Sequence, residues 1–288
     1  MIISASRRTD IPAFYGEWFM RRLREQRVLV RNPMNPQQVS EIDLAPENID
    51  GIVFWTKDPK KLLPHLDELD RLGYAYYFQF TLTPYDKTIE PHVADKSEII
   101  KTFIELSDRI GKERVIWRYD PIIMNDTLTA EYHAEAFETL CEKLYAYTKK
   151  CVISFVDAYS FLNIQELSAD ACTLLAEKLS AIADAYGLPI ASCCEKIDLA
   201  KYHIAHNKCI DDELINRIRG SIHESAITYK KDRGQRRECG CAASRDIGAY
   251  NTCDHGCAYC YAKRGKHRGR YDPASPILCD TEHSPPCP

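Results

Sequence analysis

Short apolar runs alternate with longer helical patterns from the first residues of the chain onward. The runs at 2–5, 51–56, 75–82, 114–119, 151–155 and 188–193 are rich in β-branched or aromatic residues, as strands are. Between them, apolar stripes at helical spacing end near Gly73, Gly111, Leu144 and Gly187, the last beginning at Ser168. This alternation predicts an α/β fold in which a parallel sheet is crossed by helices.

A chain of 288 residues falls within the range of one α/β barrel. We therefore expect one domain over 1–270, a parallel (β/α) partial barrel of about six to seven strands, with a cysteine-rich segment at about 190–262. Asparagine-proline pairs within 27–44 predict an inserted hairpin. Residues 271–288 show no periodicity and are expected to form a loosely ordered tail.

Polar residues follow the predicted strands at their carboxyl ends, where the loops of a parallel barrel converge. Any one of them could serve as a helix cap or turn residue, but their recurrence across five strands predicts a polar pocket. They are Ser6 to Asp10, Thr56 to Asp58, Gln79, Thr81 and Thr83, Arg118 to Asp120, and Ser154 with Asp157.

Thirteen cysteines are many for a chain of this length. No apolar run approaches the roughly 18 residues that span a bilayer, and the start lacks the layout of a signal peptide. We expect a cytoplasmic protein with no membrane partner. Since that compartment is reducing, metal ligation explains the cysteines better than disulfides do.

The segment 230–270 is basic, with eleven Lys and Arg against four acids, in a chain whose net charge is −4. Such a segment can attract an anionic substrate, a nucleic acid or an acidic electron donor. It can also be a solvated surface without a partner.

A C-x-x-x-C-x-x-C string at Cys253, Cys257 and Cys260 is the strongest motif. Three thiolates on one loop can hold three irons of a cubane and leave the fourth iron open to a small molecule. Zinc is the alternative metal, with Cys239 or Cys241 as a fourth ligand. Spacing alone leaves both metals open.

The string DIGAYNTCDHGCAYCYA resembles the cluster loop of radical S-adenosylmethionine enzymes, especially the branch near spore photoproduct lyase. ISASRRTDIPAFYGEW, IVFWTKDP, FQFTLTPYDKTIEP and RYDPIIMND resemble the second to fifth strands of that branch. In the usual order the cluster loop follows the first strand, whereas here it comes last. The resemblance therefore implies a circularly permuted barrel with the cluster loop at the C-terminus.

The chain also resembles a bacterial family called domain of unknown function 1848, over roughly residues 1 to 262. The strings SRRTDIP, FWTKDP, RYDP and CGC…DIG carry this resemblance. It implies no substrate.

The resemblance to radical S-adenosylmethionine enzymes implies roles for single residues. Cys253, Cys257 and Cys260 would bind a 4Fe-4S cluster, and Tyr259 would lie near the adenine of S-adenosylmethionine. Lys57 would neutralise the carboxylate of that cofactor. The remaining cofactor-binding candidates are Thr81 and Gln79 for the ribose, Thr9 and Asp10 for the amine, and Arg118 at a strand end.

The chemistry implied is reductive cleavage of the cofactor to methionine and a 5′-deoxyadenosyl radical, which abstracts a hydrogen atom. The substrate is unknown, with a nucleic acid or another anion as the expected class, and a flavodoxin or ferredoxin would donate the electron. The alternative function is a zinc-stabilised nucleic-acid-binding protein without catalysis. A pure electron carrier would not need the polar strand ends.

A second metal site is predicted from further cysteines late in the chain. Cys239 and Cys241 flank one glycine, which is too short a spacing for a structural disulfide in the cytosol. Together with Cys209 and Cys194, or Cys193 in place of Cys194, they would supply four thiolates. Such a set suits a second 4Fe-4S cluster or zinc equally well.

Overall fold

The computed structural model of the chain describes all residues except 163, 221–226, 267–268 and 281–288. Within these residues the main sheet has eight strands in the order β10-β1-β4-β5-β6-β7-β8-β9, each parallel to its neighbours. They are β1 (Ile2–Ala5), β4 (Gly51–Thr56), β5 (Tyr76–Thr81), β6 (Val115–Ile122), β7 (Cys151–Phe155), β8 (Ile190–Ser192), β9 (Ala205–His206) and β10 (Arg245–Asp246).

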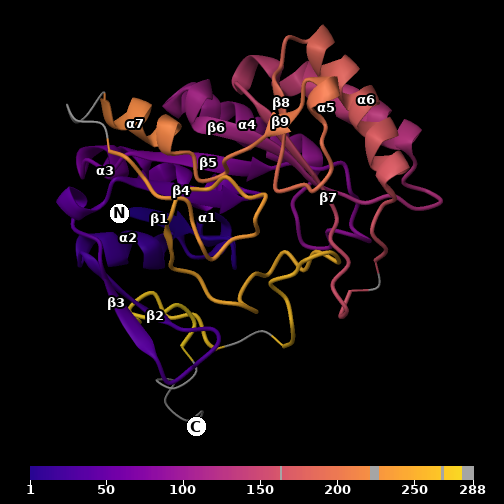
Figure 1. Cartoon of the computed structure of the whole chain (residues 1–288). Helices are drawn as coiled ribbons and strands as arrows, with labels where there is room; N and C mark the ends of the chain where they lie inside the picture. Colours follow the sequence, from indigo (N-terminus) through magenta and orange to yellow (C-terminus); the bar gives the residue numbers. More distant parts are fainter. Residues whose placement is uncertain (163, 221–226, 267–268, 281–288) are drawn as a thin grey trace.

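Helices alternate with these strands, so the predicted α/β class is confirmed (Figure 1). Because β10 and β9 form the two edges of the sheet, the architecture is a partial (β/α) barrel. The helices are α1 (Ile11–Phe14), α2 (Gly16–Arg24), α3 (Leu66–Arg71), α4 (Lys96–Ile110), α5 (Ala130–Leu144), α6 (Ala169–Ala185) and α7 (Asp212–Gly220). None of the helices that the structure describes is long and apolar enough to cross a membrane.

Local chemistry explains where the long helices begin and end. The hydroxyls of Thr129 and Ser168 accept hydrogen bonds from backbone N–H groups in the first turns of α5 and α6, at 3.1 and 3.2 Å. Gly111 ends α4 with φ of 88°, a backbone conformation that favours glycine. The predicted helix boundaries at Gly111 and Ser168 therefore rest on the expected caps.

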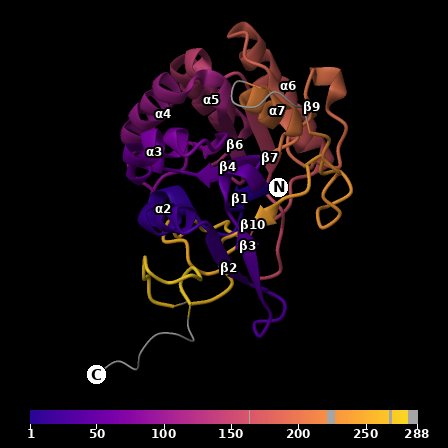
Figure 2. The same ribbon diagram turned by 90° about the vertical axis from the view of Figure 1, so that its left-hand side faces the viewer.

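The two faces of the sheet bury different parts of the chain. One face packs on helices α2 to α6 and forms the larger apolar core. The other face, which includes Ile2, Val53 and Tyr77, packs on α7 and on the segments around Cys209 and Cys241. In Figure 2, α2 to α5 form an arc on one side of the strands and α7 lies on the other. The late segments of the chain thus return to fill the inner face of the partial barrel.

The strand that precedes the Cys253 loop pairs in parallel with the N-terminal strand. Ile3 lies opposite Arg245 and Ser4 opposite Asp246 in the β1–β10 register. Asp246 also accepts hydrogen bonds from Ser4 Oγ at 3.0 Å and Ser6 Oγ at 2.7 Å. This confirms the prediction that these two strands are neighbours in one sheet. Two-residue strands such as β9 and β10 leave no pattern in the sequence, which explains why six to seven strands were expected.

The predicted hairpin at 27–44 is present as the antiparallel pair β2 (Arg27–Arg31) and β3 (Val39–Asp43). Residues 271–280, which were expected to be loosely ordered, instead pack against α2 and β2. Trp18 Nε1 donates to the Ser275 carbonyl at 2.8 Å, and Arg31 pairs with Asp280 at 2.9 Å. Leu278 and Cys279 are buried there, so apolar burial fixes this part of the tail without regular structure. Residues 281–288, including Cys287, lie outside the described part.

Candidate functional site

A cavity of about 430 Å³ opens at the carboxyl ends of the central strands. Its walls include Ser6 to Asp10 after β1, Thr56 and Lys57 at the end of β4, Thr81 on β5, and Arg118 with Asp120 on β6. Residues 253–262 contribute Cys253, Cys257 and Cys260 to the same cavity. The polar strand ends therefore form one pocket, as the sequence predicted, and the cysteine loop forms part of its wall.

Backbone contacts fix the Cys253–Cys260 loop, called the cluster loop below, against the segment that follows β5. His92 N donates to the His255 carbonyl at 3.2 Å, and Ala258 N donates to the Ile89 carbonyl at 2.9 Å. Gly256 has φ of 71° and faces Pro91 and His92, where a side chain would be crowded. The glycine of the HGC string thus lets the cluster loop reverse direction against its neighbour.

The thiols of the cluster loop interact with one another, Cys257 being buried and Cys253 and Cys260 half-buried. Burial raises the pKa of Cys257 to about 11, although the Lys57 ammonium opposes that shift. Burial and the Asp10 carboxylate raise the pKa of Cys253, and the thiols of Cys257 and Cys260 contribute. The raised pKa values of Cys253 and Cys257 disfavour their thiolates, which a bound cation would stabilise.

Asp10 joins three segments at the cavity floor. Its Oδ1 accepts a hydrogen bond from Ala13 N at 3.0 Å and caps α1. Its Oδ2 accepts one from Lys57 N at 2.7 Å and lies 2.8 Å from His255 Nε2. Asp10 also lines the cavity, so its expected contact with a cofactor amine stays a prediction. Within the chain, Asp10 positions the cluster loop through His255, a residue that sequence reasoning did not single out.

Lys57 does line the cavity, but its ammonium already pairs with Glu90, at 2.7 Å. Glu90 is 1% exposed and also accepts hydrogen bonds from Lys96, Tyr259 and, at 2.8 Å, Thr83 Oγ1. Burial opposes ionisation of Glu90, yet Lys57 and Lys96 lower its pKa to about 2. Burial likewise opposes the charge of Lys57, but Glu90 and Cys257 raise its pKa. Two ammonium groups against one carboxylate leave a net positive charge.

Three buried polar atoms on the cavity wall have no partner among the described residues. They are Thr9 Oγ1, Arg7 Nη2 and His255 Nδ1. Because an unpaired buried polar group is costly, these atoms point to a missing ligand. Thr9 and Thr81 therefore keep their places as cofactor-binding candidates, and Arg7 and His255 join them.

Gln79 does not fit its predicted role at the ribose. Its Nε2 donates to the Cys209 carbonyl at 2.7 Å, and its Oε1 accepts from Arg118 at 3.3 Å. Gln79 is fully buried beneath the cavity and is not part of its wall. Arg118 lines the cavity, but its guanidinium is held by Asp120 and reaches Cys209 Sγ at 2.9 Å. Both side chains thus support the second group of cysteines.

The second group, called the thiol cluster below, comprises Cys193, Cys194, Cys209, Cys239 and Cys241, and all five line the cavity. Cys193 Sγ lies 3.2 Å from Cys209 Sγ. Electrostatic interactions couple Cys209 with Cys241, Cys241 with Cys239 and Cys239 with Cys194. The five cysteines therefore share one cavity wall, and their binding of a metal stays a prediction. No described cysteine forms a disulfide.

Neither group is shaped around a metal ion as it stands. Among the residues that the structure describes, no group of three or more His, Cys, Asp or Glu side chains is placed so that it could hold a metal ion. A cubane places each protein sulfur on a different iron, so its ligands need not share one coordination point. A single metal ion would require the sulfurs to converge on one point, whereas a cubane would not.

Comparison with known proteins gives a family and no activity. No curated protein matches the chain. Among solved structures, a putative alpha-L-fucosidase from Bacteroides thetaiotaomicron is similar at 12% identity and a TM-score of 0.31, covering 76% of this chain and 82% of its own. A family model described as Domain of unknown function (DUF1848) matches residues 2–262. The match spans nearly the whole chain, and the protein belongs to this family.

Proposed function

We propose that the protein is a radical S-adenosylmethionine enzyme whose 4Fe-4S cluster is held by Cys253, Cys257 and Cys260. One observation carries the proposal: the three thiols of one loop line the same cavity as Lys57 and the polar strand ends. Three thiolates leave one iron of a cubane open, and that opening would face the cavity. The parallel pairing of β10 with β1 supports the permuted strand order that this assignment needs.

The residues present fit the cofactor chemically. Three thiols of one loop line the cavity, the lysine pair on Glu90 leaves an unbalanced positive charge for a carboxylate, and Thr9 Oγ1 has no partner among the described residues. When bound, the cluster and S-adenosylmethionine supply a one-electron reduction that yields methionine and a 5′-deoxyadenosyl radical for hydrogen abstraction.

The chain's own residues would bind the cofactor and hold it in a fixed orientation. Lys57 would offer its ammonium to the cofactor carboxylate while Glu90 holds the lysine in place. Tyr259 donates its hydroxyl to Glu90, and its ring lies 5.4 Å from Lys57 Nζ, so this side chain closes the wall beside the cofactor. Aromatic and apolar walls exclude water from the radical chemistry.

The substrate class we propose is anionic. Arg7 and Arg8 line the cavity, and guanidinium groups bind carboxylates and phosphates in bidentate fashion. Two other arginines of the wall, Arg118 and Arg236, already pair with Asp120 and Asp157. A nucleic acid falls within this class. A flavodoxin or ferredoxin in the reducing cytoplasm would deliver the electron, and that compartment would also keep the cysteines reduced.

The test is anaerobic purification and reconstitution, followed by S-adenosylmethionine and dithionite. Brown protein with iron and sulfide that forms 5′-deoxyadenosine supports the enzyme. Colourless protein with zinc at the cluster loop and no cofactor cleavage contradicts it and favours the nucleic-acid-binding alternative. Metal must be measured without air, because clusters of this type decay in oxygen.

A matched pair of variants tests the role of Lys57. Lys57→Met and Lys96→Met each remove one ammonium from Glu90, but Lys57 lines the cavity and Lys96 does not. We expect Lys57→Met to weaken S-adenosylmethionine binding at least about tenfold with iron content unchanged, a loss of about 1.4 kcal/mol. Lys96→Met should bind the cofactor within about twofold of wild type. Equal binding by both variants would remove Lys57 from the cofactor site.

A further inference from the structure

We propose that Cys193, Cys209, Cys239 and Cys241 bind a single Zn²⁺ through four thiolates on the inner face of the sheet. The site is separate from the cluster loop, and the proposal does not depend on the radical chemistry proposed above. The sequence left zinc and a second iron–sulfur cluster equally open at these cysteines. The geometry of the sulfurs separates the two.

The first argument is the compactness of the thiol cluster. Zinc binds thiolates at about 2.3 Å, so the sulfurs of a tetrahedral site lie about 3.8 Å apart. Cys193 Sγ and Cys209 Sγ are 3.2 Å apart, and Cys239 and Cys241 line the same cavity. A cubane requires wider separation, because each of its four sulfurs binds a different iron. The Cys193–Cys209 distance is therefore nearer to the spacing of two ligands on one ion than to that of two ligands on a cubane.

The sulfur positions differ from those of an occupied zinc site. Among the described residues the four side chains do not enclose a metal ion, and the 3.2 Å between Cys193 Sγ and Cys209 Sγ is shorter than the separation of two thiolates on one zinc. Deprotonation on metal binding removes the S–H···S bonds and makes the sulfurs repel one another. Opening from 3.2 Å toward about 3.8 Å needs only small side-chain rotations.

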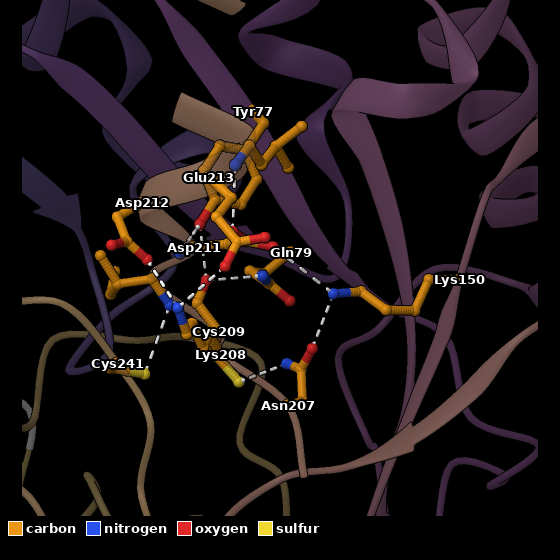
Figure 3. Close-up of polar contacts among 12 residues, drawn as sticks. Tyr77, Gln79, Lys150, Asn207, Lys208, Cys209, Asp211, Asp212, Glu213 and Cys241 are labelled. Atoms are coloured by element: carbon orange, nitrogen blue, oxygen red, sulfur yellow. Dashed lines mark hydrogen bonds and ion pairs between the residues drawn. The ribbon is translucent and has the colours of Figure 1, made fainter. Parts of the chain in front are cut away.

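The second argument is the direction of the N–H groups around the sulfurs (Figure 3). Asn207 Nδ2 donates to Cys209 Sγ at 3.2 Å, and Ile210 N donates to Cys241 Sγ at 3.3 Å. Arg118 adds a third donor, to Cys209 Sγ at 2.9 Å. A thiol has a proton of its own to donate, whereas a metal-bound thiolate only accepts. Donors gathered on sulfur are the surroundings that a metal thiolate needs.

A further layer of contacts holds these donors and the ligand backbone in place. Lys150 Nζ donates to Asn207 Oδ1 at 2.7 Å, which turns the amide nitrogen toward Cys209. Tyr77 and Gln79 donate to the Cys209 carbonyl at 2.6 and 2.7 Å, as Figure 3 shows. Such outer contacts orient the ligands of metal sites. Cys209 is therefore held rigidly before any metal binds.

The third argument is charge. Four thiolates and one Zn²⁺ carry a net charge of about −2, which a buried site must balance. Arg118 contacts Cys209, and the charge of Arg7 lies close enough to interact with both Cys209 and Cys241. Arg7 Nη2 is buried without a partner among the described residues. Two guanidinium groups thus face the sulfurs, one of them with an unused donor.

The contacts of Cys193 and Cys194 favour Cys193 as the fourth ligand. Cys193 touches Cys209 directly, whereas Cys194 touches only Cys239 and has φ of 60°, which turns the chain away after Cys193. Arg236 lies beside Cys194 rather than beside the central sulfurs. Cys194, the first choice from the sequence, therefore becomes the spare thiol. The ion would tie the end of β8, the turn before α7 and the 239–241 turn to one point.

The experiment measures zinc, iron and sulfide per chain in the variant Cys253→Ala, Cys257→Ala, Cys260→Ala, in which the cluster loop cannot bind metal. We expect about one zinc and no iron. Adding Cys209→Ser or Cys241→Ser should lower zinc at least about tenfold, and adding Cys194→Ser or Cys172→Ser should leave it unchanged. Iron with sulfide in the parent variant, or zinc that survives Cys209→Ser, would overturn the proposal.

A second measurement covers variants that fail to fold. In the folded parent variant, Co²⁺ replacing zinc should give the intense thiolate-to-metal absorption of a tetrahedral four-sulfur site. Alkylation with mass spectrometry should show Cys193, Cys209, Cys239 and Cys241 protected until a chelator is added, with Cys194 labelled beforehand. Protection of Cys194 in place of Cys193, or no protection of the four, would contradict the assignment. Failure of cofactor cleavage in wild type would leave these results untouched.

Discussion

The cluster loop and the thiol cluster line the same cavity but are assembled in different ways. Cys253, Cys257 and Cys260 lie on one stretch of chain, whereas the thiol cluster collects sulfurs from the end of β8, the segment before α7 and the 239–241 turn. The first group is defined by spacing and the second by topology. Sequence spacing can reveal chemistry only where the ligands are neighbours along the chain.

The electrostatic support of the two groups differs as well. Beside the cluster loop, the buried carboxylate of Glu90 holds Lys57 and Lys96. Beside the thiol cluster, Arg118 contacts Cys209 Sγ directly, and an exposed pair joins Arg236 to Asp157. Buried and exposed ion pairs respond very differently to substitution. Substitutions in the two regions should therefore change the free energy of unfolding by different amounts.

The largest expected effect tests the cluster loop by activity, with a buried cysteine outside both groups as the control. Cys257→Ala removes one of three ligands of the proposed catalytic cluster, so 5′-deoxyadenosine formation should fall at least about a thousandfold. Cys172→Ala, a buried cysteine in α6, should stay within about twofold of wild type. Both rates are measured by chromatography after anaerobic reconstitution. Residual activity above a tenth in Cys257→Ala would show that the cluster loop is not the catalytic site.

The next effect tests the buried charge beside the cluster loop. Glu90→Gln leaves Lys57 and Lys96 without a counter-charge, and we expect unfolding by urea to show a loss of about 3 kcal/mol at pH 7. Glu98→Gln, which removes an exposed partner of Lys101 on α4, should cause no measurable change. If Glu90→Gln is as stable as wild type, the ion pairs of Glu90 with Lys57 and Lys96 do not hold the cluster loop.

The same variant carries a pH signature. The folded pKa of Glu90 is about 2, below its ordinary value of 4.5, so its ionised form stabilises the folded state above pH 4.5. That contribution, about 3 kcal/mol, is lost as pH falls from about 4.5 toward about 2. The stability difference between wild type and Glu90→Gln should therefore shrink over this range in urea unfolding. A difference that stays constant would mean that Glu90 does not titrate as the buried partner of two lysines.

Much of the fold was predictable because each strand and helix carries a local signal. Strands β1, β4 and β7 begin and end where their apolar runs do, and caps such as Ser168 mark the helices. The tail at 271–280 was misjudged because its order comes from burial against α2 and β2, a contact between distant segments. Non-local packing leaves no periodicity in the sequence.

In the candidate site, too, local sequence patterns identified some residues, whereas non-local contacts decided the roles of others. Spacing found Cys253, Cys257 and Cys260, and the strand ends found Lys57 and Thr81. Asp10 and Gln79 were assigned to a cofactor, yet the folded chain uses their polar atoms internally. His255 was overlooked although it stands within the HGC string, and its partner Asp10 is remote in sequence. The sequence shows the type of each residue and its place in a motif. It does not show which other groups in the folded chain take up that residue's hydrogen bonds.

A smaller effect tests how tightly the cluster loop turns. Gly256→Ala would place a Cβ 3.1 Å from His92 and 3.2 Å from Pro91 at φ of 71°, and we expect a loss of about 2 kcal/mol. Gly73→Ala has a similar φ of 81° but open space around it, so it should lose only about 1 kcal/mol. Thermal and urea unfolding measure both. Equal losses would show that the contact with His92 and Pro91 does not shape the cluster loop.

The smallest effect concerns the exposed pair beside the thiol cluster. Arg236 donates to both oxygens of Asp157 at 2.8 and 2.7 Å, but the side chains are 51% and 39% exposed. Asp157→Asn should therefore cost less than about 1 kcal/mol, and 0.5 M salt should erase the difference. Because the pair restrains the segment that carries Cys239, zinc release to a chelator should quicken by up to about fivefold with zinc content unchanged. A loss of zinc, or a cost near that of Glu90→Gln, would mean that the thiol cluster depends on a surface contact and not on the topology that gathers its sulfurs.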